Sequence, residues 1–155
     1  MKKSPRDRSS KNTKRNVTGD AAPSGQRGSL HILVVENHPD TRQGLDVFLK
    51  MLGHRARFAE DVETALAAAT NGEKFDLLLS DISLPDGNGW DLLRRLDESG
   101  HRPPHAVAMS GFGSGADTEK SRAAGFETHL VKPFPPEELE HALQAVVSRR
   151  SPASG

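Results

Sequence analysis

Polar side chains follow four aliphatic stretches in this chain of 155 residues. Glu36 and Asn37 come after HILVV, Asp81 after DLLLS, Ser110 after HAVAM and Lys132 after THLV. Short apolar runs that end in polar residues are typical of buried strands. If the four strands lie side by side, two carboxylates, an amide, a hydroxyl and an ammonium group come together in one place.

Such a set suits the transfer of a phosphoryl group to a carboxylate. A carboxylate attacks a phosphoryl group only when the charge on that group is neutralised, which Mg²⁺ held by oxygen ligands can do. Lys132 and Ser110 could hold the remaining phosphoryl oxygens. Transfer to Asp81 would then form a mixed anhydride, as in enzymes that pass through an aspartyl phosphate.

The apolar pattern predicts the elements that must position these groups. Five strands are predicted, at Leu30 to Val35, Arg55 to Ala59, Phe75 to Leu79, His105 to Met109 and Thr128 to Val131. Five helices alternate with them, at Pro39 to Leu52, Val62 to Thr70, Trp90 to Glu98, Ala116 to Ala124 and Glu137 to Val147. Apolar strands in strict alternation with helices predict an α/β fold, with a parallel sheet covered on both faces. Ligands bind such sheets beyond the carboxyl ends of the strands, where all five polar groups fall.

Composition narrows the class of protein further. The chain has no cysteine, which excludes disulfides, zinc–thiolate sites and thiol catalysis. No apolar run approaches the roughly 20 residues that span a bilayer, and no signal-peptide core follows the basic N-terminus, so we expect a cytoplasmic protein with no membrane partner. Lys and Arg balance Asp and Glu at 21 each, but residues 1–29 hold eight basic and two acidic residues, a charge of +6 against −6 for the rest.

We expect three segments. Residues 1–29 are a basic tail with too few apolar side chains to order itself, and we predict disorder there. A solvated tail is favoured over an arm that binds nucleic acid, because the segment has no aromatic residue to stack on bases. Residues 30–147 form the folded domain and 148–155 a frayed C-terminal tail. We recognise no output domain after Val147.

The stretches SDISLPDGNGW and VKPF, at this spacing, make Leu30 to Val147 resemble the receiver domain of bacterial two-component response regulators. The resemblance implies a chemotaxis-regulator-like, flavodoxin-like, doubly wound (βα)5 fold in three layers, with strand order 2-1-3-4-5. It implies a phosphorelay protein and not an enzyme: a single-domain receiver that takes a phosphoryl group from a histidine kinase or phosphotransfer protein and signals to a downstream protein. Receivers that belong to or work with hybrid histidine kinases are the relatives it suggests.

The resemblance also assigns roles at the site. It makes Asp81 the phosphoacceptor, has Glu36 orient water on the metal, and gives Mg²⁺ the backbone carbonyl of Ser83 as a ligand. The family usually has a second acid, which ligates the metal, where this chain has Asn37. An amide oxygen can still bind Mg²⁺ but carries no charge, so we expect weaker metal binding and slower phosphorylation.

Ser110 takes the role of the switch hydroxyl by the same resemblance. Lys132 takes that of the phosphate-contacting lysine, followed by a cis bond to Pro133. His129 stands where the family usually has an aromatic switch residue. The loop GFGSG at 111–115 lacks the lysine of a P-loop, so we interpret it as a flexible switch loop.

Structural interpretations remain open beside these functional ones. Asn37 can cap the helix that begins near Pro39, Asp81 can cap the following turn, and His129 can be a plain surface imidazole. Two other functions also remain open. A pseudo-receiver, an interaction module with weak or no phosphorylation, is favoured by Asn37. A flavodoxin-like cofactor binder would need glycine after the first strand, where the chain has ENHPDT.

Overall fold

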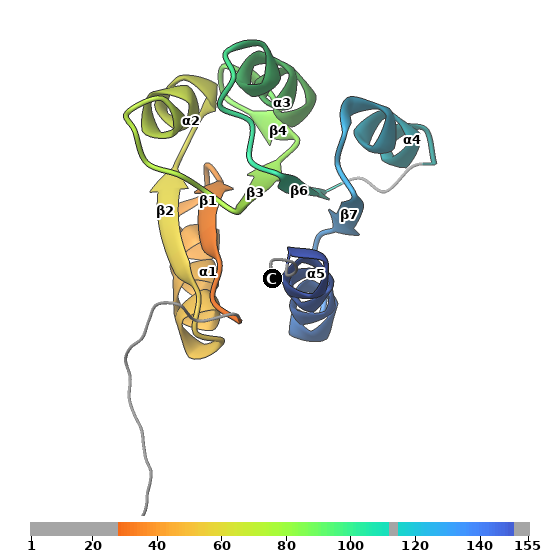
Figure 1. The fold of residues 1–155 in the computed structure, drawn as a ribbon. Coiled ribbons are helices and arrows are strands. Elements are labelled where there is room, and N and C mark those ends of the chain that lie inside the picture. Colours follow the sequence, from red (N-terminus) through yellow and green to blue (C-terminus); the bar gives the residue numbers. More distant parts are fainter. Residues whose placement is uncertain (1–27, 112–114, 151–155) are drawn as a thin grey trace, which may run out of the picture.

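The computed structural model describes residues 28–111 and 115–150. Five parallel strands form one sheet in the order β2-β1-β3-β6-β7 (Figure 1). These strands are β1 His31–Val35, β2 Arg55–Ala59, β3 Leu77–Asp81, β6 His105–Ser110 and β7 Thr128–Val131. A two-stranded antiparallel hairpin, β4 Ser83–Leu84 and β5 Gly87–Asn88, follows β3. The flavodoxin-like sheet and its predicted order, 2-1-3-4-5 when only its own strands are numbered, are confirmed.

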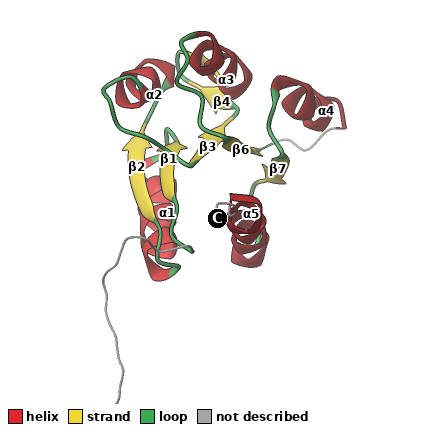
Figure 2. Cartoon of the chain, in the orientation of Figure 1, coloured by secondary structure: helices red, strands yellow, loops and turns green. Residues whose placement is uncertain are grey.

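Helices cover both faces of this sheet (Figure 2). They are α1 Pro39–Met51, α2 Val62–Ala69, α3 Gly89–Glu98, α4 Gly115–Ala124 and α5 Pro136–Arg150. Helices α1 and α5 lie on one face, and α2, α3 and α4 lie on the other (Figure 1). In the ranges 28–111 and 115–150, no helix has the length and apolar character needed to cross a membrane.

The central strands are apolar on both sides because each face meets a layer of helices. In β1, Leu33 and Val35 belong to the core cluster with α2 and α3, whereas Ile32 and Val34 belong to the cluster with α1 and α5. All four side chains are buried. This two-sided burial explains why the strand has a continuous apolar run instead of alternation. Truncating one such core residue to alanine typically costs about 2–5 kcal/mol.

Several element limits differ from the predicted ones. Strand β3 begins at Leu77, two residues later than predicted, because pairing with β1 sets Leu77 opposite Ile32. The carboxylate of Asp76 accepts the N–H of His31 just before that pairing starts. The β4–β5 hairpin was not predicted, and α5 continues to Arg150, past the expected end at 147.

The proposed limits of the folded domain, 30–147, remain a prediction. The tails expected at 1–29 and 148–155 fall largely outside the described residues, as does the centre of the predicted switch loop, residues 112–114.

Candidate functional site

The strand ends bring the predicted polar groups to one edge of the sheet. Glu36 directly follows β1, Asp81 is the last residue of β3, Ser110 is the last residue of β6, and Lys132 directly follows β7. Strands β1 and β3 are neighbours at the centre of the sheet, where the strand order reverses direction. This is the switch point at which parallel α/β sheets bind ligands.

Lys132 joins the two acids of the site. Its Nζ donates to Oε1 of Glu36 at 2.7 Å and to Oδ2 of Asp81 at 2.9 Å. The Glu36 side chain is fully buried and that of Asp81 is 6% exposed. Buried carboxylates are stable only when a partner compensates their charge, so Lys132 is a structural requirement of the site in this state.

The pKa shifts at the site agree with this pairing. Burial by itself raises the pKa of Glu36, but the hydrogen bonds from Lys132 and His38 outweigh burial and hold the pKa below its ordinary value. For Lys132, burial lowers the pKa, but the hydrogen bonds to Glu36 and Asp81 outweigh it and raise the pKa above its ordinary value. Glu36 and Lys132 are therefore both charged at neutral pH.

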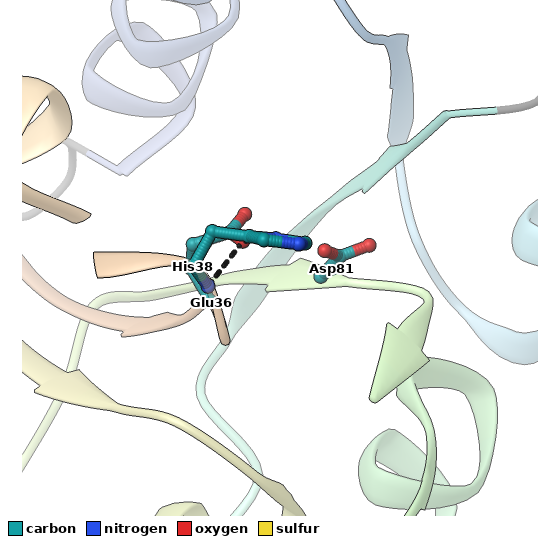
Figure 3. Close-up of side chains that lie close together, drawn as sticks. All are labelled: Glu36, His38 and Asp81. Carbon is teal, nitrogen blue, oxygen red and sulfur yellow. Dashed lines mark hydrogen bonds and ion pairs between the residues drawn. The ribbon is translucent and has the colours of Figure 1, made fainter. Parts of the chain in front are cut away.

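His38 is a member of the site that the sequence analysis did not assign. Its Nδ1 lies 3.0 Å from Oε2 of Glu36, and the same oxygen accepts the backbone N–H of His38, also at 3.0 Å. Ligand atoms of Glu36, His38 and Asp81 all lie within 4.8 Å of one another. Figure 3 shows the His38 ring extending from the end of β1 toward Asp81. Its place two residues after Glu36 was the sequence signal that could have revealed it.

These donors fit a divalent cation. Two carboxylates and a ring nitrogen converge, and the carboxylates are the ligands that Mg²⁺ prefers in proteins. Ser83 lies next to them, since its backbone N–H donates to Oδ1 of Asp81 at 3.3 Å. The roles of the Ser83 carbonyl and the Asn37 amide as metal ligands remain predictions.

The interpretation of Asn37 as a helix cap is wrong. The N-cap of α1 is His38, which makes no side-chain capping bond, and Pro39 occupies the first helical position. Proline there needs no N–H partner, which lessens the need for a side-chain cap. Asn37 instead accepts through its backbone: Arg42 donates to the carbonyls of Glu36 and Asn37 at 2.9 and 3.0 Å, which fixes the turn that carries both residues.

A glycine allows α3 to begin directly beside Asp81. A Cβ on Gly89 would lie 2.7 Å from the backbone oxygen of Asp81, closer than real Cβ atoms approach. The N–H of Gly89 donates to the carbonyl of Ile82 at 2.8 Å. The segment that presents Asp81 is therefore held by the first residue of α3, and this position tolerates no side chain without movement.

His129 is not a plain surface imidazole. It is half-buried, and both ring nitrogens have partners: Nε2 lies 2.8 Å from Oγ of Ser110 and Nδ1 lies 2.7 Å from Oγ of Ser121. Trp90, half-buried in the first turn of α3, donates its indole N–H to Oγ of Ser121 at 2.9 Å. The Lys132–Pro133 bond is cis, as the resemblance implies.

The fold and the site together define a doubly wound α/β domain with an acidic site at its switch point. The chain matches the model of the response regulator receiver domain over residues 32–144, and it belongs to that family. This shows the family that the sequence motifs had suggested.

Two curated relatives illustrate the similarity in sequence. The virulence sensor protein BvgS of Bordetella bronchiseptica is 30% identical over 139 residues, 86% of this chain. The two-component response regulator PhoP of Pseudomonas aeruginosa is 34% identical over 122 residues, 79% of this chain. The matches span 11% of BvgS and 53% of PhoP, so this chain corresponds to one part of each relative.

Solved structures show the same fold. The chemotaxis response regulator CheY4 of Vibrio cholerae has a TM-score of 0.68 and 28% identity, over 75% of this chain and 97% of CheY4. The receiver domain of the sensor histidine kinase PA1611 of Pseudomonas aeruginosa, solved with a magnesium ion coordinated in its active-site cleft, has a TM-score of 0.69 and 27% identity. That match covers 77% of this chain and 98% of the PA1611 domain.

Proposed function

We propose that the chain accepts a phosphoryl group on Asp81 from a histidine kinase or phosphotransfer protein and signals through protein contacts. The observation that carries the proposal is the Asp81 carboxylate, nearly buried at the switch point with the ammonium group of Lys132 at 2.9 Å. A structural role in capping the next turn would not require a lysine that binds both Asp81 and Glu36. Membership of the receiver family supports the same function.

The chemistry is a nucleophilic displacement at phosphorus. A carboxylate oxygen of Asp81 attacks the phosphorus of a phosphohistidine, an O–P bond forms and the P–N bond breaks, with its electron pair leaving on the donor imidazole. Lys132 already contacts Asp81, so its ammonium group lies where it can also contact a phosphoryl oxygen. Ser110, at the end of the adjacent β6, supplies a hydroxyl to another phosphoryl oxygen.

A bound Mg²⁺ would neutralise charge on the phosphoryl group during transfer. Glu36 and Asp81 are the charged groups that would hold it, with the Asn37 amide and the Ser83 backbone carbonyl as further oxygen donors. The magnesium ion in the cleft of the PA1611 receiver supports this choice of cation. His38, whose ring faces the same oxygens, offers a nitrogen ligand in addition.

The pseudo-receiver is the second candidate function, and a specific observation favours it. With Asn37 in place of an acid, the two carboxylates of the described site are already bridged by Lys132, so the attraction for a cation is reduced. In that case the chain would act as a protein-interaction module without phosphorylation.

Treatment with a small phosphodonor such as phosphoramidate and millimolar Mg²⁺, followed by intact mass, separates the two functions. The wild-type chain should gain one phosphoryl group, and Asp81→Asn should gain none. Asp97→Asn, which changes an exposed carboxylate on α3, is the matched control and should label like wild type. Labelling that persists in Asp81→Asn would refute the nucleophile, whereas a folded wild type that is never labelled would favour the pseudo-receiver.

A further inference from the structure

We propose that His38 is a metal ligand, and that it gives the site a preference for a first-row transition cation such as Zn²⁺ over Mg²⁺. The inference concerns the cation site of the proposed function and rests on it. It goes further, because it names the residue that determines which cation the site selects.

Three side chains of different chemistry offer ligand atoms to one point. Glu36 and Asp81 each offer a carboxylate oxygen and His38 offers a ring nitrogen, and these atoms all lie within 4.8 Å of one another. Nδ1 of His38 lies 3.0 Å from Oε2 of Glu36. Neighbouring ligands of a cation with bonds of about 2.1 Å lie roughly 3.0–3.4 Å apart. These two atoms therefore already have the spacing of ligands that share a cation, which would replace the hydrogen now between them.

The backbone holds the His38 ring in this position. His38 is extended, with φ −84° and ψ 122°, and the proline that follows it disfavours the helical alternative. The N–H of His38 donates to Oε2 of Glu36 at 3.0 Å. Arg42 donates to the carbonyls of Glu36 and Asn37 and fixes the same turn. The ring is therefore anchored from below, while its side chain is 71% exposed and open to an arriving cation.

The two carboxylates are oriented by a partner outside the ligand set. Lys132 donates to Oε1 of Glu36 and to Oδ2 of Asp81. The oxygen of Glu36 that lies beside His38 is Oε2, which is not the oxygen that Lys132 binds. Ligating carboxylates in natural metal sites are held by outer hydrogen bonds in the same way. The site therefore has oriented ligands as well as the right ligand atoms.

The types of donor decide which cation such a site prefers. Mg²⁺ takes oxygen ligands in octahedral geometry, whereas an imidazole nitrogen suits Zn²⁺ and related transition cations. Zinc sites with an open position commonly have three protein ligands of nitrogen or oxygen type, the number that Glu36, His38 and Asp81 supply. Asn37 acts in the same direction, because a neutral amide attracts Mg²⁺ less than an acid would.

A purely structural role for His38 makes a different prediction. If His38 only orients Glu36 through their hydrogen bond, its removal should weaken the binding of Zn²⁺ and Mg²⁺ by the same factor. If His38 is a ligand, its removal should weaken Zn²⁺ binding selectively. The ratio of the two affinities therefore separates a ligand from a residue that acts through Glu36.

Calorimetric titration of the full chain with Zn²⁺ and with Mg²⁺ measures this ratio. His38→Phe keeps a ring of similar size but removes its nitrogens, and the exposure of this side chain should let the variant fold. We expect Zn²⁺ to bind wild type more tightly than Mg²⁺, and His38→Phe to lose about tenfold to a hundredfold in Zn²⁺ affinity with its Mg²⁺ affinity unchanged. His141→Phe, which changes an exposed histidine on α5, is the matched control and should bind both cations like wild type. An equal loss for both cations in His38→Phe, or a wild type that prefers Mg²⁺, would overturn the inference.

X-ray absorption at the zinc edge detects the ligand directly. With one equivalent of Zn²⁺, wild type and His141→Phe should show the outer-shell scattering of an imidazole ring, and His38→Phe should not. Added Mg²⁺ should lower the apparent Zn²⁺ affinity of wild type, because both cations need Glu36 and Asp81. A wild-type spectrum without imidazole scattering, or Zn²⁺ binding that Mg²⁺ does not affect, would overturn the inference even if His38→Phe failed to fold. No measurement here uses a phosphodonor, so a chain that is never phosphorylated would refute the proposed function while these results still decide the role of His38.

Discussion

Replacing Lys132 with methionine should destabilise the fold strongly, because it removes an ammonium group that pairs with two inward-facing acids, Glu36 and Asp81. Methionine keeps much of the length and packing of the lysine stem but not its charge. Breaking a buried ion pair from one side typically costs about 3–5 kcal/mol. The Lys132 side chain is 23% exposed, so water compensates part of the loss. We therefore expect a loss of about 2–4 kcal/mol in the free energy of unfolding at pH 7.

The pH dependence of this loss identifies its electrostatic cause. The pKa of Glu36 is lowered in the folded wild type, so its contribution to stability is present above the unfolded value near 4.5 and is lost as pH falls through the folded pKa. The pKa of Lys132 is raised, so its contribution is present below the unfolded value near 10.5 and is lost as pH rises through the folded pKa. The difference in the free energy of unfolding between wild type and Lys132→Met should be largest at pH values between these two pKa values, and it should shrink in acid.

Urea denaturation at a series of pH values measures this difference. Lys50→Met is the matched control: Lys50 makes a single ion pair with Asp46 on the exposed face of α1, and its side chain is 72% exposed. That change should cost at most about 0.5 kcal/mol, as for other exposed pairs one helical turn apart. A loss in Lys132→Met that is the same at pH 4 and pH 7, or no larger than in the control, would refute the assigned role of Lys132.

Two further substitutions test the charge and the packing at the edge of the sheet that carries Asp81. Asn37→Asp should tighten Mg²⁺ binding about tenfold, equivalent to ~1.4 kcal/mol, because it adds a third carboxylate beside Glu36 and Asp81. A magnesium titration of wild type and variant measures both affinities, and equal affinities would contradict this prediction. Gly89→Ala should destabilise the protein by about 1–3 kcal/mol, because its Cβ would meet the backbone of Asp81 at 2.7 Å, as thermal melts would show. Gly44→Ala is the control: Gly44 lies on α1 with open space around an added Cβ, so this change should cause no loss of stability.

The sheet could be predicted from the sequence because two-sided burial leaves a strong local signal. The apolar runs before Glu36 and Asp81 are buried on both faces between two layers of helices, so their polar ends had to meet at one edge of the sheet. The start of β3 could not be predicted, since Phe75 is as apolar as Leu77 and only pairing with β1 separates them. The β4–β5 hairpin is too short to have a periodic pattern.

The parts of the site that could not be predicted from the sequence share one physical reason. The partners of His129 come from positions 110 and 121, and Trp90 joins from 31 residues before Ser121, so no spacing in the sequence connects them. His38 was not assigned and the cap interpretation of Asn37 was wrong because both depend on the conformation of the turn before α1. Arg42 helps to fix that turn by donating to the carbonyls of Glu36 and Asn37. Side-chain hydrogen bonds between distant elements are decided by tertiary structure and leave no periodic signal.

The neutral side chain at position 37 has a consequence for the metal-free protein as well. Glu36 and Asp81 contribute two negative charges and Lys132 one positive charge, so these three groups sum to −1 in the described structure. An aspartate at position 37 would bring the sum to −2 within a mostly buried site, and like charges at a few ångströms repel even at an effective dielectric near 20. Asn37→Asp should therefore lower stability in the absence of Mg²⁺ and recover it as Mg²⁺ is added, whereas wild type should depend much less on the cation. Thermal melts of both proteins across a magnesium titration test this reciprocity, and an Asn37→Asp protein as stable as wild type without metal would show that the repulsion is relieved by water.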